Sequence, residues 1–296
     1  MSLSIRDIRY VLAVVTSGQL SAAAAELGVT QPALTKAVKR VEEEFGIDLF
    51  ERAARGMVLT STGLRVVDQL HALQSAYTDT VHLVDELRAS SSGLLRIGVT
   101  DITARNRIAS ALGSLLGQRP GLRVKLSIDR SDGLVSQIGH GELDLALVPV
   151  YEGQLIEADQ TRIENDLMVP VVRKGHPLAT RSALTPGDLE HCGWILSSAL
   201  SSAYRTLSAV LLEAGLGPPN IVMEAPFASE INLAVLAETD LVTLAPRSFL
   251  EHSGKAGFVE LPIPALQIPR SVVLLSRPGA FWSPLMEAMK ERLLKA

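Results

Sequence analysis

The sequence has almost no cysteine and no long apolar run. Cys192 is the only cysteine among the 296 residues, which excludes an intramolecular disulfide and a zinc site built from several cysteines. No uninterrupted apolar run reaches the roughly 20 residues that a membrane-spanning helix needs, and the N-terminus lacks the basic-then-apolar order of a secretory signal peptide. We therefore expect a cytoplasmic protein.

Motifs of the common enzyme classes are missing as well. The sequence has no glycine-rich phosphate loop, no His-Glu-x-x-His and no Gly-x-Ser-x-Gly. His191 and Cys192 resemble a base and a thiol, but sequence neighbours point in different directions. His71 and His82 would lie about 16 Å apart on one helix, too far for one metal. We expect no enzyme, no cofactor and no metal.

Composition and charge favour several soluble domains rather than one strongly charged binding surface. The chain is 47% hydrophobic and 20% charged, with a net charge of −4, which suits two or three domains. Residues 1–60 carry seven basic and seven acidic side chains, and most of the acids lie at Glu42 to Glu44 or beyond. Any attraction to phosphate in this part is therefore local, modest and sensitive to salt.

Residues 20–39 have the layout of a helix-turn-helix, a unit that usually reads DNA. Ala24 is small where the two helices must cross closely, and Gly28 can take the positive φ that ends the first helix. Apolar residues that would form a shared core between the helices complete the pattern: Ala23, Leu27, Val29, Leu34 and Ala37.

The second helix of this unit has a basic outer face. Thr30 suits the N-cap and Pro32 the first turn, so the helix should start at Gln31. Because one helix fits into the major groove, we expect DNA contacts from this face and its surroundings. The candidates are Ser21, Thr30, Gln31, Pro32, Ala33, Thr35, Lys36, Lys39 and Arg40. For the charges alone, an ordinary amphipathic helix with a solvated face is the alternative.

A hairpin and a long helix should follow. Two short apolar runs flank residues 53–56 and predict a β-hairpin wing, with Arg52 at its base and Arg55 at its tip as further DNA candidates; the alternative is a solvated tip. Thr60 caps a helical stretch to about Ala89, roughly 44 Å long. Its apolar residues are spaced like a coiled-coil seam and predict a homodimer: Val66, Leu70, Leu73, Tyr77, Val81, Val84 and Leu87.

At this point the chain resembles the LysR-type transcriptional regulators. The resemblance rests on Ile8 to Ala24, Thr30-Gln-Pro-Ala-Leu-Thr, Val41-Glu-Glu-Glu-Phe-Gly, Leu49-Phe-Glu-Arg, Leu59-Thr-Ser-Thr-Gly63, Gly141-Glu-Leu-Asp-Leu-Ala and Lys174-Gly-His-Pro-Leu. It implies an α/β protein with a winged helix-turn-helix, a dimerising linker helix and a two-lobed effector domain built like a periplasmic binding protein. It also implies homotetramers, dimers of dimers, on double-stranded promoter DNA.

The alternation of strand and helix patterns predicts two α/β lobes independently of the family resemblance. Strand candidates lie at residues 94–99, 123–128 and 143–150, and again at 194–196, 221–223 and 241–244. We expect a DNA-binding domain at 1–60, a linker helix at 61–90 and an effector domain at 91–296. Lobe I would take about 91–165 and 269–296, and lobe II about 166–268, with two chain crossings as a hinge.

The carboxyl ends of these strands should form the ligand site, because ligands of open α/β sheets bind there, at helix N-termini. By resemblance, Thr100, Ile102, Thr103 and Ser131 fall where the family contacts its effectors. The strand ends and helix starts add Pro149, Ser198, Ser201, Ser202 and Phe227. The alternative for each Ser or Thr is a simple helix cap.

The hydroxyls and helix N-termini favour an anionic effector such as a small organic acid. Asp101 favours a neutral or cationic ligand instead, unless it points outward or pairs with Arg105. The segment 237–242 lacks the glycines usual in the family, so the turn there should differ. The sequence thus predicts an effector-controlled, sequence-specific DNA-binding regulator. The alternative is a small-molecule-binding protein with a vestigial DNA-binding head.

Overall fold

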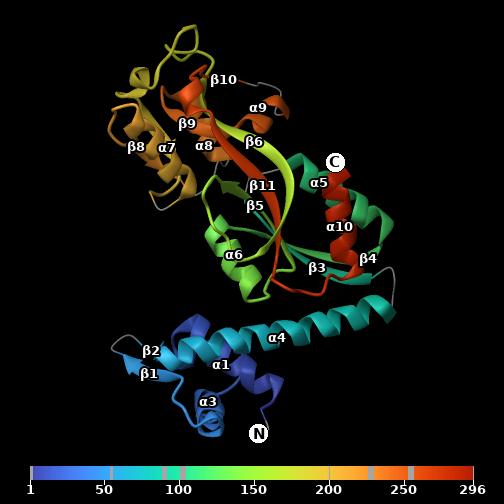
Figure 1. Ribbon diagram of the computed structural model, residues 1–296. Helices are drawn as coiled ribbons and strands as arrows, with labels where there is room; N and C mark the ends of the chain where they lie inside the picture. The colour runs from blue at the N-terminus through green and yellow to red at the C-terminus, as the bar shows by residue number, and fades with distance from the viewer. Residues whose placement is uncertain are drawn as a thin grey trace. The chain divides into compact units, whose positions relative to one another are not determined.

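The computed structural model describes residues 3–53, 56–88, 92–100, 105–199, 201–225, 230–252 and 257–295. The chain forms two compact units (Figure 1). The first, here the head unit, comprises Met1–Ser90 together with Gly139–Glu142, and the second, here the two-lobed unit, comprises Ser91–Ile138 and Leu143–Ala296. No helix within the described ranges is long and apolar enough to cross a membrane.

The head unit is a winged helix-turn-helix followed by a long helix. Its elements are α1 (Ile5–Ser17), α2 (Leu20–Glu26), α3 (Gln31–Phe45), β1 (Phe50–Ala53), β2 (Gly56–Leu59) and α4 (Ser61–Arg88). Gly28 has φ +66° between α2 and α3, and Thr30 caps α3 by accepting from the Ala33 N–H at 3.4 Å. Both features agree with the local signals in the sequence.

The core of the head unit joins all of its helices to the hairpin. Ile8, Val11, Leu34, Val41 and Leu49 are almost completely buried in it. Ala23 and Ala24 are buried as expected at the crossing of α2 and α3, whereas Leu27 and Val29 are only half-buried.

Glu42 fixes the hairpin against α3. Its carboxylate accepts the N–H groups of Leu49 and Phe50 at 2.9 and 3.1 Å. These two N–H groups belong to the chain entering β1, so the hairpin cannot turn relative to α3 without breaking both bonds.

The long helix α4 shows two kinds of apolar surface. It has 28 residues, about 42 Å at 1.5 Å per residue. Leu70 is 4% exposed in the core of its own head unit, and Val66 is half-buried against that core. This differs from the expected seam, because the first two turns face α1 and the hairpin instead of a partner. The free seam is therefore Leu73, Tyr77, Val81 and Val84, all at least 38% exposed; the Leu87 side chain lies outside the described residues.

The two-lobed unit is built on one mixed sheet. Within the described residues, nine strands pair in the order β4-β3-β5-β11-β6-β9-β7-β8, with β10 beside β6. Lobe I contains β3 (Ser92–Val99), α5 (Arg105–Gln118), β4 (Gly121–Ile128), α6 (Ser131–Gly139), β5 (Leu145–Tyr151) and α10 (Pro284–Lys295). Lobe II contains η1 (Pro186–Leu189), β7 (Gly193–Leu196), α7 (Ser202–Glu213), β8 (Asn220–Glu224), α8 (Glu230–Glu238), β9 (Val242–Pro246), α9 (Arg247–His252), β10 (Phe258–Glu260) and η2 (Pro264–Leu266).

Two long strands connect the lobes. They are β6 (Asp159–Arg173) and β11 (Ile268–Ser276), which pair antiparallel from Ile268 opposite Met168 to Ser276 opposite Asp159. Their positions agree with the two chain crossings expected from the sequence, and the alternating strands and helices confirm the predicted α/β class.

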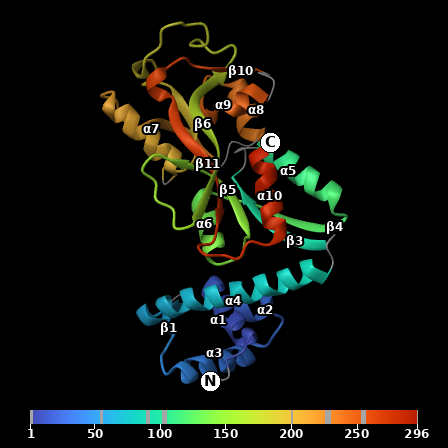
Figure 2. The ribbon, with the colours of Figure 1, turned by 45° about the vertical axis from the view of Figure 1, so that its right-hand side comes forward.

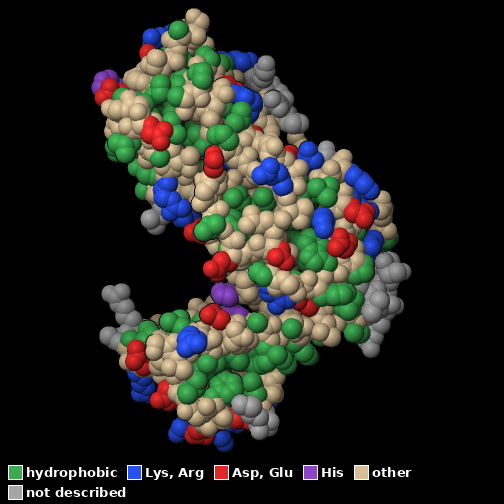
Figure 3. Space-filling model, in the orientation of Figure 1, with side chains coloured by type: hydrophobic (Ala, Val, Ile, Leu, Met, Phe, Trp, Pro, Cys, Tyr) green, Lys and Arg blue, Asp and Glu red, His purple; other side chains and the backbone are tan. Residues whose placement is uncertain are grey.

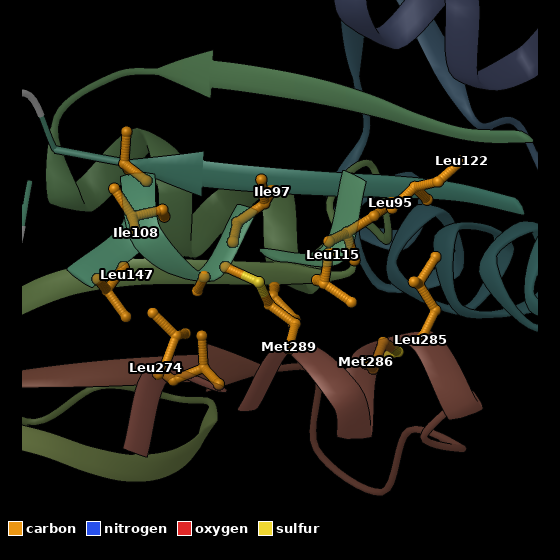
Figure 4. Packing of buried hydrophobic residues seen from close by; sticks show 14 of the residues in the cluster. Leu95, Ile97, Ile108, Leu115, Leu122, Leu147, Leu274, Leu285, Met286 and Met289 are labelled. Atoms are coloured by element: carbon orange, nitrogen blue, oxygen red, sulfur yellow. The ribbon is translucent and has the colours of Figure 1, made fainter. Parts of the chain in front are cut away.

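Helices cover both faces of the sheet in each lobe. In lobe I, α5 and α10 lie side by side on one face, as Figures 1 and 2 both show. Their apolar residues meet those of β3, β5 and β11, and Figure 4 shows Leu115 of α5 and Met289 of α10 pointing toward Ile97 of the sheet. The opposite face packs on α6 through Leu134 and Ile138. Each lobe is thus a three-layer sandwich with its own core.

Gly63 in the first turn of α4 tests how tightly the hairpin packs on this helix. A Cβ at Gly63 would lie 2.1 Å from the carbonyl oxygen of Leu49, an oxygen that already accepts the Thr60 N–H at 3.0 Å. Gly63→Ala should therefore destabilise the protein by about 1–3 kcal/mol in urea unfolding followed by circular dichroism.

The matched control is Gly113→Ala in α5. A Cβ there meets nothing within 4 Å, so the better helix propensity of alanine should raise stability by about 0.5–1 kcal/mol. Equal stability of the Gly63→Ala variant and the unmodified protein would contradict the close approach.

Candidate functional sites: an exposed helix face and a cleft between two lobes

The outer face of α3 is fully available for a partner. Gln31, Pro32, Ala33, Thr35 and Lys36 are all exposed, and so are Lys39, Arg40, Ser21 and Thr30. Leu34, Ala37, Val38 and Val41 hold the opposite face in the core. The helix therefore presents its N-terminal half and one whole side to solvent, which is the geometry by which a recognition helix enters the major groove.

The three cations of this face differ in their partners. Lys39 Nζ lies 3.8 Å from a carboxylate oxygen of Glu43, and Arg40 donates to the buried Asp7 of α1. Burial acts to raise the pKa of Asp7, but hydrogen bonds from Ser4 and the charge of Arg40 outweigh it and hold the pKa below its usual value. Among the described residues, only Lys36 of these three has no acidic partner.

The structure describes one of the two arginines that the sequence predicts in the hairpin. Arg52 is exposed on β1, whereas Arg55 lies outside the described residues. The Met57 N–H donates to the Gly18 carbonyl at 2.9 Å. This bond anchors β2 to the turn between α1 and α2, so Arg52 projects from a hairpin whose position relative to the helix-turn-helix is fixed.

The two-lobed unit contains a cavity of about 670 Å³ between its lobes. Thr100, Arg130, Ser131 and Pro149 line it from lobe I. From lobe II it is lined by Ser197, Ser201, Ser202, Arg205, Ala225, Asn232 and Thr243, among others. A volume of this size accommodates a small organic molecule.

Most of the described residues that the sequence predicts for the ligand site line this cavity, with one exception. Thr100, Ser131, Pro149, Ser201 and Ser202 line the cavity. Ser198 does not: Ser197, directly after β7, lines it instead and donates to the Ser201 hydroxyl at 2.8 Å. The carbonyl of Ser198 accepts the Ser201 N–H within the turn. Ile102, Thr103 and Phe227 lie outside the described residues, as does Asp101.

Thr100 carries an unsatisfied group. Its hydroxyl oxygen is buried and has no hydrogen-bond partner among the described residues, although its N–H donates to Leu147 at 3.3 Å. A buried hydroxyl without a partner is uncommon in folded proteins. In a residue that lines a cavity, it indicates a group that a ligand or a water molecule satisfies.

Sequence reasoning missed several of the residues that line the cavity. Arg205 is in the first turn of α7, Asn232 in α8, and Tyr151 and Arg270 on neighbouring strands. Arg205 had a usable signal, because it follows the serine-rich start of a helix. Tyr151 had one as well, because it directly follows the strand expected at 143–150. Arg270 had none, because its meeting with Tyr151 depends on the pairing of β5 with β11.

Histidine and cysteine form no metal centre in the described part of the chain. The ring of His71 stacks on His140 with centroids 3.9 Å apart. Burial, followed by the neighbouring His140, lowers the pKa of His71 to about 4, so this ring is neutral at pH 7. Burial also raises the pKa of the Cys192 thiol, as do Asp188 and Asp240, which keeps it unreactive.

His176, in the segment Lys174-Gly-His-Pro-Leu, is buried. Its Nδ1 accepts the Leu178 N–H at 3.0 Å, and its Nε2 lies 3.2 Å from the Asp240 carbonyl oxygen. Arg173 also bonds Asp240, at 2.7 Å. These contacts hold the turn before β9 without the glycines expected from the family.

An exposed recognition helix with a wing, joined in one chain to a two-lobed unit with a ligand-sized cavity, defines a DNA-binding regulator that responds to a small molecule. Comparison with protein families identifies the family to which this regulator belongs. Residues 5–64 match the model of the bacterial regulatory helix-turn-helix protein, lysR family, and residues 88–296 match that of the LysR substrate binding domain. The chain belongs to the LysR family of transcriptional regulators.

Individual relatives agree with this assignment. The SDS degradation transcriptional activation protein of a Pseudomonas species is 29% identical over 98% of this chain and 95% of its own length. The crystal structure of full-length CbnR with its target DNA has a TM-score of 0.53 at 17% identity, and covers 99% of both chains. The regulatory domain of Synechocystis CcmR with 2-PG has a TM-score of 0.60 at 19% identity, over 68% of this chain and 96% of that one.

Lys36 should contribute more to DNA binding than Lys39. Because Lys36 has no acidic partner in the part of the chain that the structure describes and lies in the N-terminal half of α3, Lys36→Ala should weaken binding to the best site by about 1–3 kcal/mol and reduce discrimination at one base pair. Fluorescence anisotropy against a library of single base-pair changes measures both effects.

Lys39→Ala is the matched control on the same face. Because Glu43 already partly neutralises Lys39, its loss should weaken binding to all sequences alike and lower the slope of log K against log salt by at most about one. If Lys36→Ala left both affinity and base preference unchanged, this assignment of the α3 face would be wrong.

Proposed function

We propose that this regulator binds a small organic anion in the cavity between its lobes and that the bound anion changes its affinity for promoter DNA. The observation that carries the proposal is the convergence of two helix N-termini on one cavity. Ser131 begins α6 and Ser201 caps α7, and both residues line the cavity. N-terminal turns present free N–H groups and a positive dipole end, which stabilise an anion.

Basic side chains at the same helix starts strengthen this preference. Arg130 directly precedes α6, and Arg205 lies in the first turn of α7. A cation at a helix N-terminus is unfavourable by itself, because it faces the positive end of the dipole. In this structure the Arg205 guanidinium donates to the Ser202 hydroxyl at 3.3 Å. An anion in the cavity would offset this repulsion.

The acids of the cavity do not reverse the balance. Asp132 pairs with Arg130 at 3.2 Å and is largely exposed. Glu157, the second acid of the lining, and Arg205 are both exposed and carry opposite charges, which leaves the two helix N-termini to favour an anion. On the face of the two-lobed unit that Figure 3 shows, acidic and basic side chains are interspersed.

The proposed control of DNA binding follows from linkage. Thr100 and Ser131 belong to lobe I, whereas Ser201 and Arg205 belong to lobe II, so a ligand that bridges them favours one arrangement of the lobes. Such a ligand changes DNA affinity only by the difference in its own affinity for the two arrangements, typically about 1–3 kcal/mol.

The experiment that tests this function combines a thermal-shift screen of organic acids, amino acids and aromatic acids with gel shifts on the promoter region of the protein's own gene. We expect at least one acid to raise the melting temperature and to change DNA affinity. Binding of DNA without any ligand effect would overturn the effector proposal. Ligand binding without any DNA binding would favour a binding protein with a vestigial head.

The Thr100→Val variant tests whether the ligand binds beside the Thr100 hydroxyl. Because the Thr100 hydroxyl has no partner among the described residues, valine should leave the melting temperature of the free protein unchanged or slightly higher. The shift produced by the active acid should shrink, since the ligand loses a hydrogen-bond partner. An unchanged ligand shift in Thr100→Val would place the ligand away from this hydroxyl.

We further propose that α4 pairs with the same helix of a second copy, as a step toward a tetramer on DNA. Leu73, Tyr77, Val81 and Val84 are spaced by three and four residues and are exposed within one chain. That spacing is typical of a helix whose seam packs on another helix. An apolar stripe left in water along three turns would also promote aggregation, which a partner helix prevents.

Leu73→Glu should split this dimer. A carboxylate in an apolar helix contact remains unpaired, at a cost of several kcal/mol. Ala72→Glu, an exposed position on another side of the same turn, adds the same charge outside the seam and should leave the dimer intact. Sedimentation velocity at micromolar concentration distinguishes the two. A dimeric Leu73→Glu variant would show that α4 does not form the main interface.

A further inference from the structure

Three residues meet on neighbouring strands at the point where the chain passes between the lobes. Arg270 of β11 lies opposite Tyr151 of β5 on one side and opposite Asp166 of β6 on the other. Arg270 and Tyr151 also line the ligand cavity. The guanidinium therefore lies where both lobes share strands, and not on a helix that belongs to one lobe.

Arg270 and Asp166 form a buried ion pair. Their side chains are each 4% exposed, and Arg270 Nη2 and Nε lie 2.7 and 3.2 Å from one Asp166 oxygen. Taking both charges out of water is expensive, so such a pair alone adds little to stability. Arg270 and Tyr151 line the cavity and are here called its floor, whereas Asp166 lies outside this lining. A charged pair beside the cavity therefore calls for a functional explanation.

Asp166 has enough other donors to hold its charge. It accepts the Leu167 N–H at 2.8 Å and the Ser248 N–H and hydroxyl at 3.4 and 3.2 Å. Ser248 is in α9 of lobe II. This network fixes the plane of the Arg270 guanidinium without using all of its hydrogen-bonding capacity.

The remaining donors of Arg270 can serve a ligand. A guanidinium has five N–H groups; Asp166 takes two, and Tyr151 accepts one. Burial raises the pKa of Tyr151 although Arg270 opposes the rise, so the phenol remains protonated and is a further donor. Two N–H groups of Arg270 are left without a partner among the described residues.

We propose that Arg270, positioned by Asp166, anchors the head group of the ligand at the floor of the cavity, and that this head group is a single carboxylate. The inference rests on the proposed anion-binding function and adds the anchoring residue, the orientation and the ligand class. Two parallel N–H groups match the two oxygens of a carboxylate. The helix N-termini then stabilise the same charge from either lobe.

The charge balance at the floor favours a ligand head group with a single negative charge. Asp166 already neutralises Arg270, so a carboxylate leaves this buried group with a net charge of about −1, which Arg205 and the helix N-termini offset. A phosphate dianion would leave about −2 in the same place, and uncompensated buried charge is strongly unfavourable. Phosphate esters are therefore poor ligands at this floor.

The walls above the floor are apolar. Met168, Leu196 and Leu244 line the cavity together with Val135 and Ile156. A ligand whose carboxylate lies at Arg270 places its body against these side chains. The geometry thus selects an amphipathic monocarboxylate with a hydrocarbon or aromatic body over a compact, multiply charged acid.

The test measures affinities by titration calorimetry for hexanoate, octanoate and phenylacetate, for the amide of each, and for phenyl phosphate. The variant is the double substitution Arg270→Gln with Asp166→Asn, because removing either charge alone leaves the other buried and unpaired. Arg162→Gln is the control, since Arg162 lines a second groove of the same strands and not this cavity. All measurements use the full-length protein.

We expect the unmodified protein to bind at least one of the acids at least tenfold more tightly than its amide, and more tightly than phenyl phosphate. The double variant should lower the acid-to-amide ratio to about two or less with little change in amide affinity. A purely structural role would instead weaken acid and amide alike. Arg162→Gln should keep the ratio of the unmodified protein.

Three outcomes would overturn the proposal. The first is a double variant that keeps its acid preference, which would assign the carboxylate to the helix N-termini. The second is tighter binding of phenyl phosphate than of the acids. The third is no binding of any of the acids to the unmodified protein; the broader proposed function fails as well only if the general ligand screen also gives no thermal shift.

Discussion

The antiparallel pairing of β6 with β11 constrains the whole two-lobed unit, because these two strands are shared by both lobes. Their register puts Arg270 beside Asp166 and Tyr151, and a slip of one residue would turn each of these side chains to the other face of the sheet. The buried ion pair makes such a slip costly, since two unpaired charges would replace one satisfied network. The cavity floor is therefore defined by the same contacts that connect the lobes, and lobe movement has to occur around it.

The head unit depends on a comparable constraint between backbone groups. Glu42 binds the two N–H groups that lead into β1, and Gly63 leaves room for the Leu49 carbonyl against α4. The recognition helix, the hairpin and the linker helix are thus connected through a few residues around Leu49. A DNA-binding surface made of α3 and the hairpin is consequently rigid, and a change in α4 reaches it as a movement of the whole head rather than as a rearrangement within it.

Much of this fold was predictable because its signals are local. Caps such as Thr30, positive-φ glycines such as Gly28, and strand ends such as Thr100 are specified within a few residues. The sites were predictable only where they coincide with such signals. Ser198 was predicted for the ligand site although Ser197 lines the cavity, because the sequence does not show which serine after the strand faces it. Val66 and Leu70 were assigned to a partner because a stripe does not say what covers it. His176 and Arg270 were missed because their contacts join residues 64 and 104 positions apart.

The location of Arg270 has a consequence for how a ligand acts on the lobes. Residues on α6 and α7 each move with one lobe, so their distance from each other changes when the lobes move. Arg270 lies on a strand common to both and keeps its partner Asp166, which Ser248 in turn holds. A carboxylate held there is a fixed point, and both helix starts come close enough to stabilise its charge only in one arrangement of the lobes. The contribution of Arg270 to the ligand's binding free energy is then the same in every arrangement of the lobes. The contributions of Ser131 and Arg205 differ from one arrangement to another. By the rule that a ligand shifts an equilibrium only through differential affinity, the floor sets how tightly a ligand binds and the helix starts set how strongly it switches the protein.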